Sequence, residues 1–95
     1  MRVKVSRAAD SDLDSILDYS LAHHSREIAE GYLRTIQATF ARLETFPALG
    51  VARSDLKVGL RLITVGEHAI YYRIDDDCVL IARVLHKAMD PARHF

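Results

Sequence analysis

The chain opens with a short alternation of apolar and polar residues, in which Val3 and Val5 share one side. This alternation over residues 2–6 predicts a short strand with one apolar face. Ser6 then fits a helix N-cap, and the apolar stripe that follows at helical spacing predicts a helix over about residues 8–22.

The strongest periodic signal runs from Ile28 to Leu43, where apolar residues recur every three or four positions. Ser25 fits the N-cap of this second helix, and Pro47 and Gly50 end it, so the pattern predicts a helix over about residues 26–46. Because only a few residues separate two amphipathic helices, we expect them to fold back as an antiparallel hairpin.

After the second helix the period changes to two, which indicates strands. The pattern predicts a loop over residues 51–59 and three strands, Leu60–Val65, His68–Ile74 and Cys78–His86, followed by an irregular tail, Lys87–Phe95. Short turns at residues 66–67 and 75–77 join the strands as an antiparallel meander. The order strand, helix, helix, strand, strand, strand predicts one α+β domain over residues 1–95, with the helices on one face of a four-stranded sheet.

The last predicted strand is apolar on both faces from Cys78 to Leu85, and residues 69–72 are nearly so. Two helices can cover only one face of a four-stranded sheet, and an antiparallel sheet with a solvated second face should alternate. Either the tail and the loop 51–59 bury the second face, or a protein partner covers it. The pattern leaves both explanations open.

Composition narrows the class of protein. The 95 residues are 49% hydrophobic and carry 13 basic and 13 acidic side chains, so there is no basic excess of the kind that non-specific nucleic-acid binders show. The sequence has no apolar run near the length of a membrane span and no signal-peptide pattern. With Cys78 as its one cysteine, the chain fits the reducing cytoplasm.

Candidate chemistry is sparse. The five histidines and Cys78 lack the spacing of metal ligands, so we expect no metal and no cofactor. RNA cleavage is the remaining possibility, since it needs an acid, a base and cations. Its candidates are His68, Arg73, Arg83, His86 and His94. The hairpin register places Arg73 on the face opposite Arg61, which favours arginines at the rim of an interface over a convergent active site.

The C-terminal third resembles a known family. The segment Tyr72-Arg73-Ile74, an acidic turn, residues 79–86 with their Arg-Val-Leu-His ending, and Met89-Asp90 are similar to the end of ParE toxins, in the RelE/ParE superfamily of type II toxin–antitoxin systems. Earlier segments agree, namely Ala9-x-x-Asp12-Leu13-x-x-Ile16 and Phe46-Pro47-x-x-Gly50.

The resemblance implies a small cytoplasmic bacterial toxin, without a cofactor, that a cognate ParD-like antitoxin neutralises by direct binding. Sequence-specific DNA contact would come only through the antitoxin. ParE members are associated with poisoning DNA gyrase, whereas RelE members cut messenger RNA on the ribosome. His68 and Ala88 stand at or near positions where basic residues are expected in RelE toxins. This difference from the RelE pattern favours gyrase poisoning without catalysis. A ribosome-dependent mRNA endonuclease is the alternative.

Two contact surfaces follow from this interpretation. The doubly apolar strand and its neighbour predict the antitoxin-binding residues, which are Tyr71, Arg73, Val79, Ile81 and Arg83. The tail mixes positive charges with apolar tips and predicts the target-binding residues, which are His86, Lys87, Met89, Arg93 and Phe95.

Overall fold

The computed structural model describes residues 1–95. Its elements are β1 (Arg2–Val5), α1 (Arg7–His23), α2 (Arg26–Thr45), β2 (Val51–Ala52), β3 (Arg61–Val65), β4 (His68–Asp75), β5 (Cys78–His86) and a 3₁₀ helix (Pro91–Arg93). The five strands form one sheet in the order β1-β5-β4-β3-β2. The pair β1–β5 is parallel and the others are antiparallel. The chain is therefore an α+β domain, as predicted.

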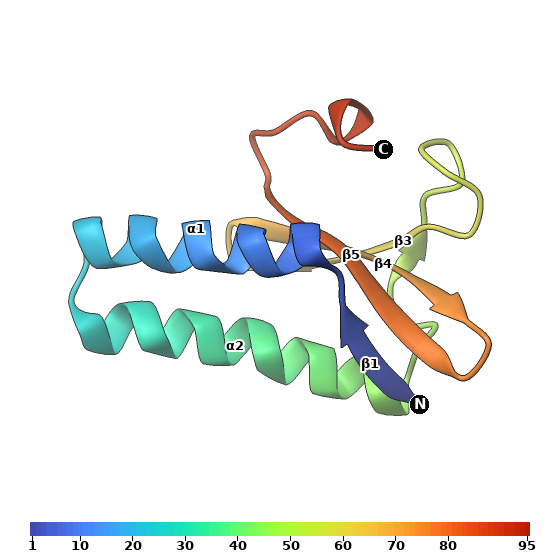
Figure 1. The fold of residues 1–95 in the computed structure, drawn as a ribbon, viewed down its shortest axis with the longest axis horizontal. Helices are drawn as coiled ribbons and strands as arrows, with labels where there is room; N and C mark the ends of the chain where they lie inside the picture. Colours follow the sequence, from blue (N-terminus) through green and yellow to red (C-terminus); the bar gives the residue numbers. More distant parts are fainter.

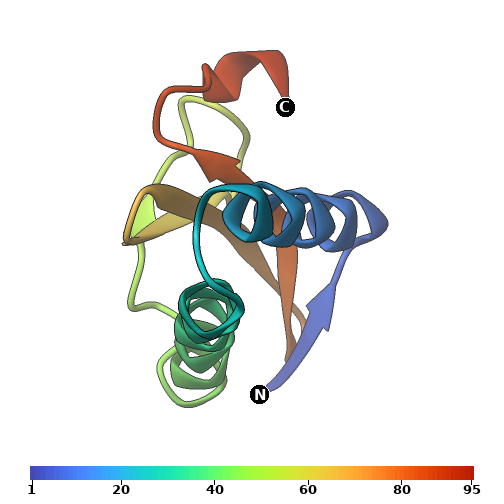
Figure 2. The same cartoon turned by 90° about the vertical axis from the view of Figure 1, so that its left-hand side faces the viewer.

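The helical hairpin, α1 and α2, covers one face of the sheet (Figures 1 and 2). Both helices begin at the predicted caps, because Ser6 Oγ accepts the backbone N–H of Ala9 at 3.0 Å and Ser25 Oγ accepts that of Ile28 at 3.2 Å. The predicted helix bounds are confirmed to within one residue at each end. Neither helix is long and apolar enough to cross a bilayer.

The β3–β4 hairpin has the predicted register, with Val65 opposite His68 and Arg61 opposite Tyr72. Its turn residue Gly66 has φ +54°, and a Cβ there would lie 2.7 Å from the ring of Tyr32 on α2. The turn and α2 therefore fit closely only because position 66 has no side chain.

Two elements differ from the prediction. The sheet has five strands rather than four, because Val51–Ala52 within the expected loop pairs with β3. Two residues are too few to show a period of two, so the pattern could not reveal this strand. The tail, expected to be irregular, contains the 3₁₀ helix Pro91–Arg93, which Asp90 caps by accepting the backbone N–H of Ala92 at 3.1 Å.

The core has two parts, one on each face of the sheet. The main part packs the helices against side chains of β4 and β5, and its fully buried members include Ile36, Leu43, Ile70 and Tyr72. The smaller part lies on the opposite face and consists of Leu60, Ala69, Tyr71 and Leu85, with Leu56 and Phe95 packed against it. The tail and residues 53–60 lie together on that side of the molecule, away from α2 (Figures 1 and 2).

Of the two explanations for the doubly apolar strand, burial by the chain's own segments therefore accounts for β5. The ring centroids of Tyr71 and Phe95 are 5.2 Å apart, so the end of the tail covers this second face directly.

A bulge in β5 decides which side chains face the helices. Tyr71 pairs with Arg83 but Tyr72 pairs with Ile81, so Ala82 is an extra residue. Before the bulge Val79 and Ile81 join the main core, and after it Val84 does. An extra residue shifts the alternation by one position. The bulge thereby brings His86, two residues after Val84, to the helix side of the sheet, opposite His68 on β4.

Candidate functional site

A cleft of about 690 Å³ lies between the end of the helical hairpin and the end of the sheet. In Figure 1 the helices extend past the strands on the side of the α1–α2 turn. The apolar side chains that line the cleft are Ile16, Tyr19, Ile28, Tyr32, Val84 and Met89. Its polar lining consists of Asp12, Ser15, Ser20, His24, Glu67, His68 and His86.

Three of the apolar lining residues are widely exposed. Tyr19 is 65% exposed, Ile28 58% and Met89 50%. They come from α1, α2 and the segment after β5, so three separate parts of the chain contribute to one apolar surface. Exposed apolar surface of this kind marks sites of protein interaction.

The floor of the cleft holds a hydrogen-bonded pair, Tyr32 and His68. The Tyr32 hydroxyl lies 2.5 Å from His68 Nδ1 and 3.2 Å from the Val65 carbonyl oxygen, and it accepts the backbone N–H of Glu67 at 3.1 Å. Burial raises the pKa of the Tyr32 hydroxyl. Burial also lowers the pKa of His68, with the neighbouring His86 adding to the effect and Glu67 opposing it. We therefore expect His68 to be neutral at neutral pH.

His68 and His86 form a cross-strand pair with ring centroids 5.3 Å apart and an edge-on arrangement. His86 Nδ1 accepts the backbone N–H of Ala88 at 3.0 Å, which places the proton of a neutral ring on Nε2. Beside the pair, Lys87 Nζ lies 3.8 Å from a carboxylate oxygen of Glu67. Two adjacent imidazoles can act as acid and base, but no arginine lines the cleft to hold a phosphate.

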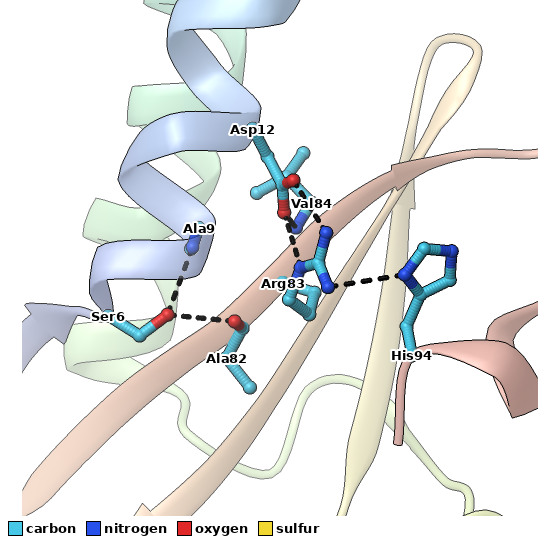
Figure 3. A network of polar contacts seen from close by, with 7 residues as sticks. All are labelled: Ser6, Ala9, Asp12, Ala82, Arg83, Val84 and His94. Atoms are coloured by element: carbon cyan, nitrogen blue, oxygen red, sulfur yellow. Dashed lines mark hydrogen bonds and ion pairs between the residues drawn. The ribbon is translucent and has the colours of Figure 1, made fainter.

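A second polar cluster joins α1, β5 and the tail (Figure 3). Arg83 donates two hydrogen bonds to Asp12, each 2.8 Å long, and a third to His94 Nδ1 at 3.2 Å. Asp12 also accepts the backbone N–H of Val84 at 2.9 Å, and Ser6 Oγ donates to the Ala82 carbonyl at 2.8 Å. The hydrogen bond to Asp12 raises the pKa of Arg83, so the guanidinium stays charged. These contacts hold the bulge against the start of α1.

The structure distributes the five residues considered for RNA cleavage over three places. His68 and His86 meet in the cleft, whereas Arg83 and His94 belong to the cluster at the start of α1. Arg73 forms an exposed ion pair with Asp75 at 3.0 Å. The residues do not converge on one site.

Most of the residues considered for antitoxin binding lie below the surface. Val79 and Ile81 are both 0% exposed in the main core, because residues before the bulge face the helices. Tyr71 is buried beneath Phe95, and Arg83 is held by Asp12. A partner could touch Val79 or Ile81 only by displacing the helical hairpin, so the structure corrects their assignment to a contact surface. Arg73 has the most exposed side chain of the five, at 39%, and Arg83 follows at 23%.

The residues considered for target binding divide between two places. His86 and Met89 line the cleft, and Lys87 lies at its rim beside Glu67. Arg93 is exposed on the 3₁₀ helix, whereas Phe95 packs on the covered face of the sheet.

The sequence analysis missed Tyr19, Ile28 and Tyr32 as cleft residues. Ile28 and Tyr32 belong to the periodic stripe of α2, which the pattern assigned to the core as a whole. Only the length of the hairpin relative to the sheet shows that the stripe continues past the strands (Figure 1). The sequence signal for these residues is that the apolar stripe continues to the α1–α2 turn, where the helices have no strand to pack against.

Comparison with known proteins places the chain in a family. The family model described as the ParE toxin of the type II toxin–antitoxin system parDE matches residues 3–91. Toxin ParE1 of Caulobacter vibrioides is 36% identical over 91 residues, which cover 96% of this chain and 94% of that protein. Toxin ParE1 of Mycobacterium tuberculosis is 32% identical over 94 residues, covering 98% of this chain and 96% of that protein.

Solved structures share the fold. A chain from the chromosomal ParDE toxin–antitoxin system of P. aeruginosa superposes with a TM-score of 0.80 at 24% identity, over 90% of this chain and 95% of that one. A chain from the RelBE2 toxin–antitoxin complex of Mycobacterium tuberculosis gives a TM-score of 0.57 at 22% identity, over 90% of this chain and 96% of that one. At such identities the likeness is one of fold. The family model and the curated relatives together show that the chain belongs to the ParE toxins of type II toxin–antitoxin systems.

Proposed function

We propose that this chain arrests bacterial growth in the cytoplasm and is neutralised by direct binding of a cognate ParD-like antitoxin in the cleft. The observation that carries the docking site is the cluster of Tyr19, Ile28 and Met89, three large apolar side chains left at least half exposed around one concavity. The opposite face of the sheet is already covered by the chain itself.

The cleft suits an amphipathic segment that folds on binding. Burial of a large apolar side chain contributes roughly 1.5–3 kcal/mol, so the three exposed side chains could together offset much of the ordering entropy of such a segment. Insertion of the apolar face of a helix into a groove is a common mode of peptide recognition. Most of the groove lining comes from α1, α2 and the end of β5, which are regular elements already formed in the chain by itself.

For the target we propose DNA gyrase, which the chain would poison by binding, without catalysis and without a cofactor. This step rests on the family resemblance. The exposed contact residues we assign to it are Lys87, Met89 and Arg93. Because Met89 also lines the cleft, an antitoxin seated there would cover part of the target surface, which gives neutralisation a simple steric cause.

One specific observation favours a second candidate function. The adjacent imidazoles of His68 and His86 could supply the base and acid of RNA cleavage on the ribosome. Inhibition of supercoiling by purified gyrase, together with growth arrest that survives both His68→Ala and His86→Ala, supports gyrase as the target. Loss of toxicity in both variants, with the fold intact by circular dichroism, would support the endonuclease instead.

A pair of matched substitutions tests the docking site. Ile28→Asp places a charge at the cleft and should weaken binding of the antitoxin encoded beside the toxin by at least roughly 100-fold, because a buried unpaired charge costs several kcal/mol. Val58→Asp is the control, since Val58 is 90% exposed and lies between β2 and β3, away from the cleft. Calorimetry that gives both variants the same affinity would place the docking site elsewhere.

A further inference from the structure

The cleft presents no unpaired charge while its histidines are neutral. Of its two carboxylates, Asp12 is held by Arg83 at 2.8 Å and Glu67 lies 3.8 Å from Lys87. The remaining polar lining residues are serines and histidines. The surface is therefore complementary to an uncharged, apolar partner face as long as His68, on the floor of the cleft, carries no proton.

His68 can gain a proton without losing its hydrogen bond to Tyr32. When the neutral ring carries its proton on Nε2, the Tyr32 hydroxyl can donate to Nδ1. In the charged ring Nδ1–H would donate to the Tyr32 oxygen, and the hydroxyl hydrogen would turn to the Val65 carbonyl, which lies 3.2 Å away. The Tyr32 hydroxyl and His68 Nδ1 therefore have a hydrogen-bond partner in both states, so protonation at Nδ1 needs no rearrangement of the backbone.

A charge on His68 would therefore leave the fold intact and weaken the binding of an apolar partner in the cleft. We propose that His68 makes docking in the cleft sensitive to protons, so that the apolar face of the antitoxin segment binds while His68 is neutral and is released as His68 becomes charged. The proposal rests on the assignment of the cleft as the antitoxin site. A cation buried under an apolar surface without a counter-charge loses its hydration, which disfavours the charged form.

The groups around His68 set the direction of the effect. It is faced by Tyr32 from α2 and by His86 from β5, while Glu67 and Lys87 lie at the rim and Asp12 and His24 line the cleft farther along the helices. Burial is the largest cause of the lowered His68 pKa, and Glu67, which alone opposes it, is exposed and paired. A partner that adds burial lowers this pKa further.

The direction in which affinity changes with pH follows from these causes of the lowered His68 pKa. Since the partner lowers the pKa of His68, binding expels a proton wherever the free chain is protonated, and the affinity falls as the pH drops. Below the pKa of the free chain, one coupled proton weakens binding by up to about tenfold per pH unit. Above it, the affinity does not depend on this group.

Calorimetric titration of the co-encoded antitoxin at pH 7.5 and pH 5.5 tests the inference. The wild-type chain should bind more weakly at pH 5.5, by up to about tenfold, because one proton is released from a group whose free pKa lies below 6.5. Titrations in two buffers of different ionisation enthalpy should show this proton release. His68→Gln should lose most of the pH dependence. His94→Gln should retain it, because His94 contacts Arg83 outside the cleft. Melting curves confirm that each variant is folded at both pH values.

The possible failures are distinct. Affinity that is independent of pH, dependence that persists in His68→Gln, or proton uptake on binding would each overturn the proton-sensitive docking. If Ile28→Asp still weakens binding at pH 7.5, the cleft remains the docking site and only its regulation is refuted. If Ile28→Asp binds as well as the wild type, the docking site itself is refuted.

Discussion

The helical hairpin meets the sheet at two places that differ in how many of their polar and apolar groups are already in contact with a partner. At the start of α1, Asp12 accepts two hydrogen bonds from Arg83 and one from the Val84 backbone, so each of its carboxylate oxygens has a partner. At the cleft, the Tyr32 hydroxyl lies between two alternative acceptors, and large apolar side chains remain exposed. The first junction is closed and fixes the fold, whereas the second is open and can respond to a partner or a proton.

The closed junction should give the largest loss on substitution. Asp12→Ala would leave the Arg83 guanidinium partly buried without its counter-charge and the Val84 N–H without its acceptor, so the free energy of unfolding should fall by roughly 2–4 kcal/mol. Urea denaturation measures this change in the free energy of unfolding. Asp55→Ala is the control, because it breaks an exposed ion pair with Arg53 and should leave the free energy of unfolding nearly unchanged. Equal losses in the two variants would show that the junction is not a special point of the fold.

The floor of the cleft can be tested through two glycines that both have positive φ. Gly66 (φ +54°) faces the Tyr32 ring, whereas Gly59 (φ +82°) has open space where a Cβ would lie. Gly59→Ala should cost only backbone strain, about 1 kcal/mol, and Gly66→Ala should cost roughly 2–3 kcal/mol because Tyr32 must also move. Thermal unfolding compares the two. If they melt at the same temperature, the contact between the turn and α2 contributes nothing to stability.

The sequence predicted the elements that form the two junctions but not the contacts between them. The helices and β5 were predicted because their apolar periods are long and their caps and breakers are local, as at Ser6, Ser25 and Pro47. The partners Asp12 and Arg83 are 71 residues apart, and Tyr32 and His68 are 36 apart. No local pattern links residues at such separations, so neither contact could be predicted.

The bulge had the widest consequence for the predicted sites. A strand that is apolar on both faces gives no sign of where one extra residue enters, so it did not reveal that Val79 and Ile81 lie under the helices while His86 lines the cleft. The family resemblance could supply the order of the elements and the class of protein. It could not supply the side of the sheet on which each residue falls.

The end of the tail contacts the closed junction and the covered face of the sheet, so its removal should affect stability and leave the cleft unchanged. Deletion of residues 94–95 removes His94 from Arg83 and Phe95 from Tyr71. We expect a loss of roughly 1–2 kcal/mol, or several degrees in melting temperature for a domain of this size. Antitoxin affinity below the transition should not change, since neither residue lines the cleft. A truncated chain with an unchanged melting temperature that no longer inhibits gyrase would instead make these residues target contacts.

The smallest expected effect is the pH dependence of stability that His68 confers on the free chain. Its folded-state pKa is lowered by burial, so the unfolded chain binds the proton more readily. The stabilising contribution is complete above the unfolded-state pKa of about 6.5 and is lost as the pH falls through the lowered folded-state value. Urea denaturation between pH 7.5 and pH 5 should show this decline in the wild type, and His68→Gln should flatten it. His24→Gln is the control, because the His24 side chain is exposed and should leave the slope unchanged. A slope that is the same in all three proteins would mean that His68 is as well hydrated in the fold as in the unfolded chain, and the contrast between the closed and the open junction would then rest on apolar exposure alone.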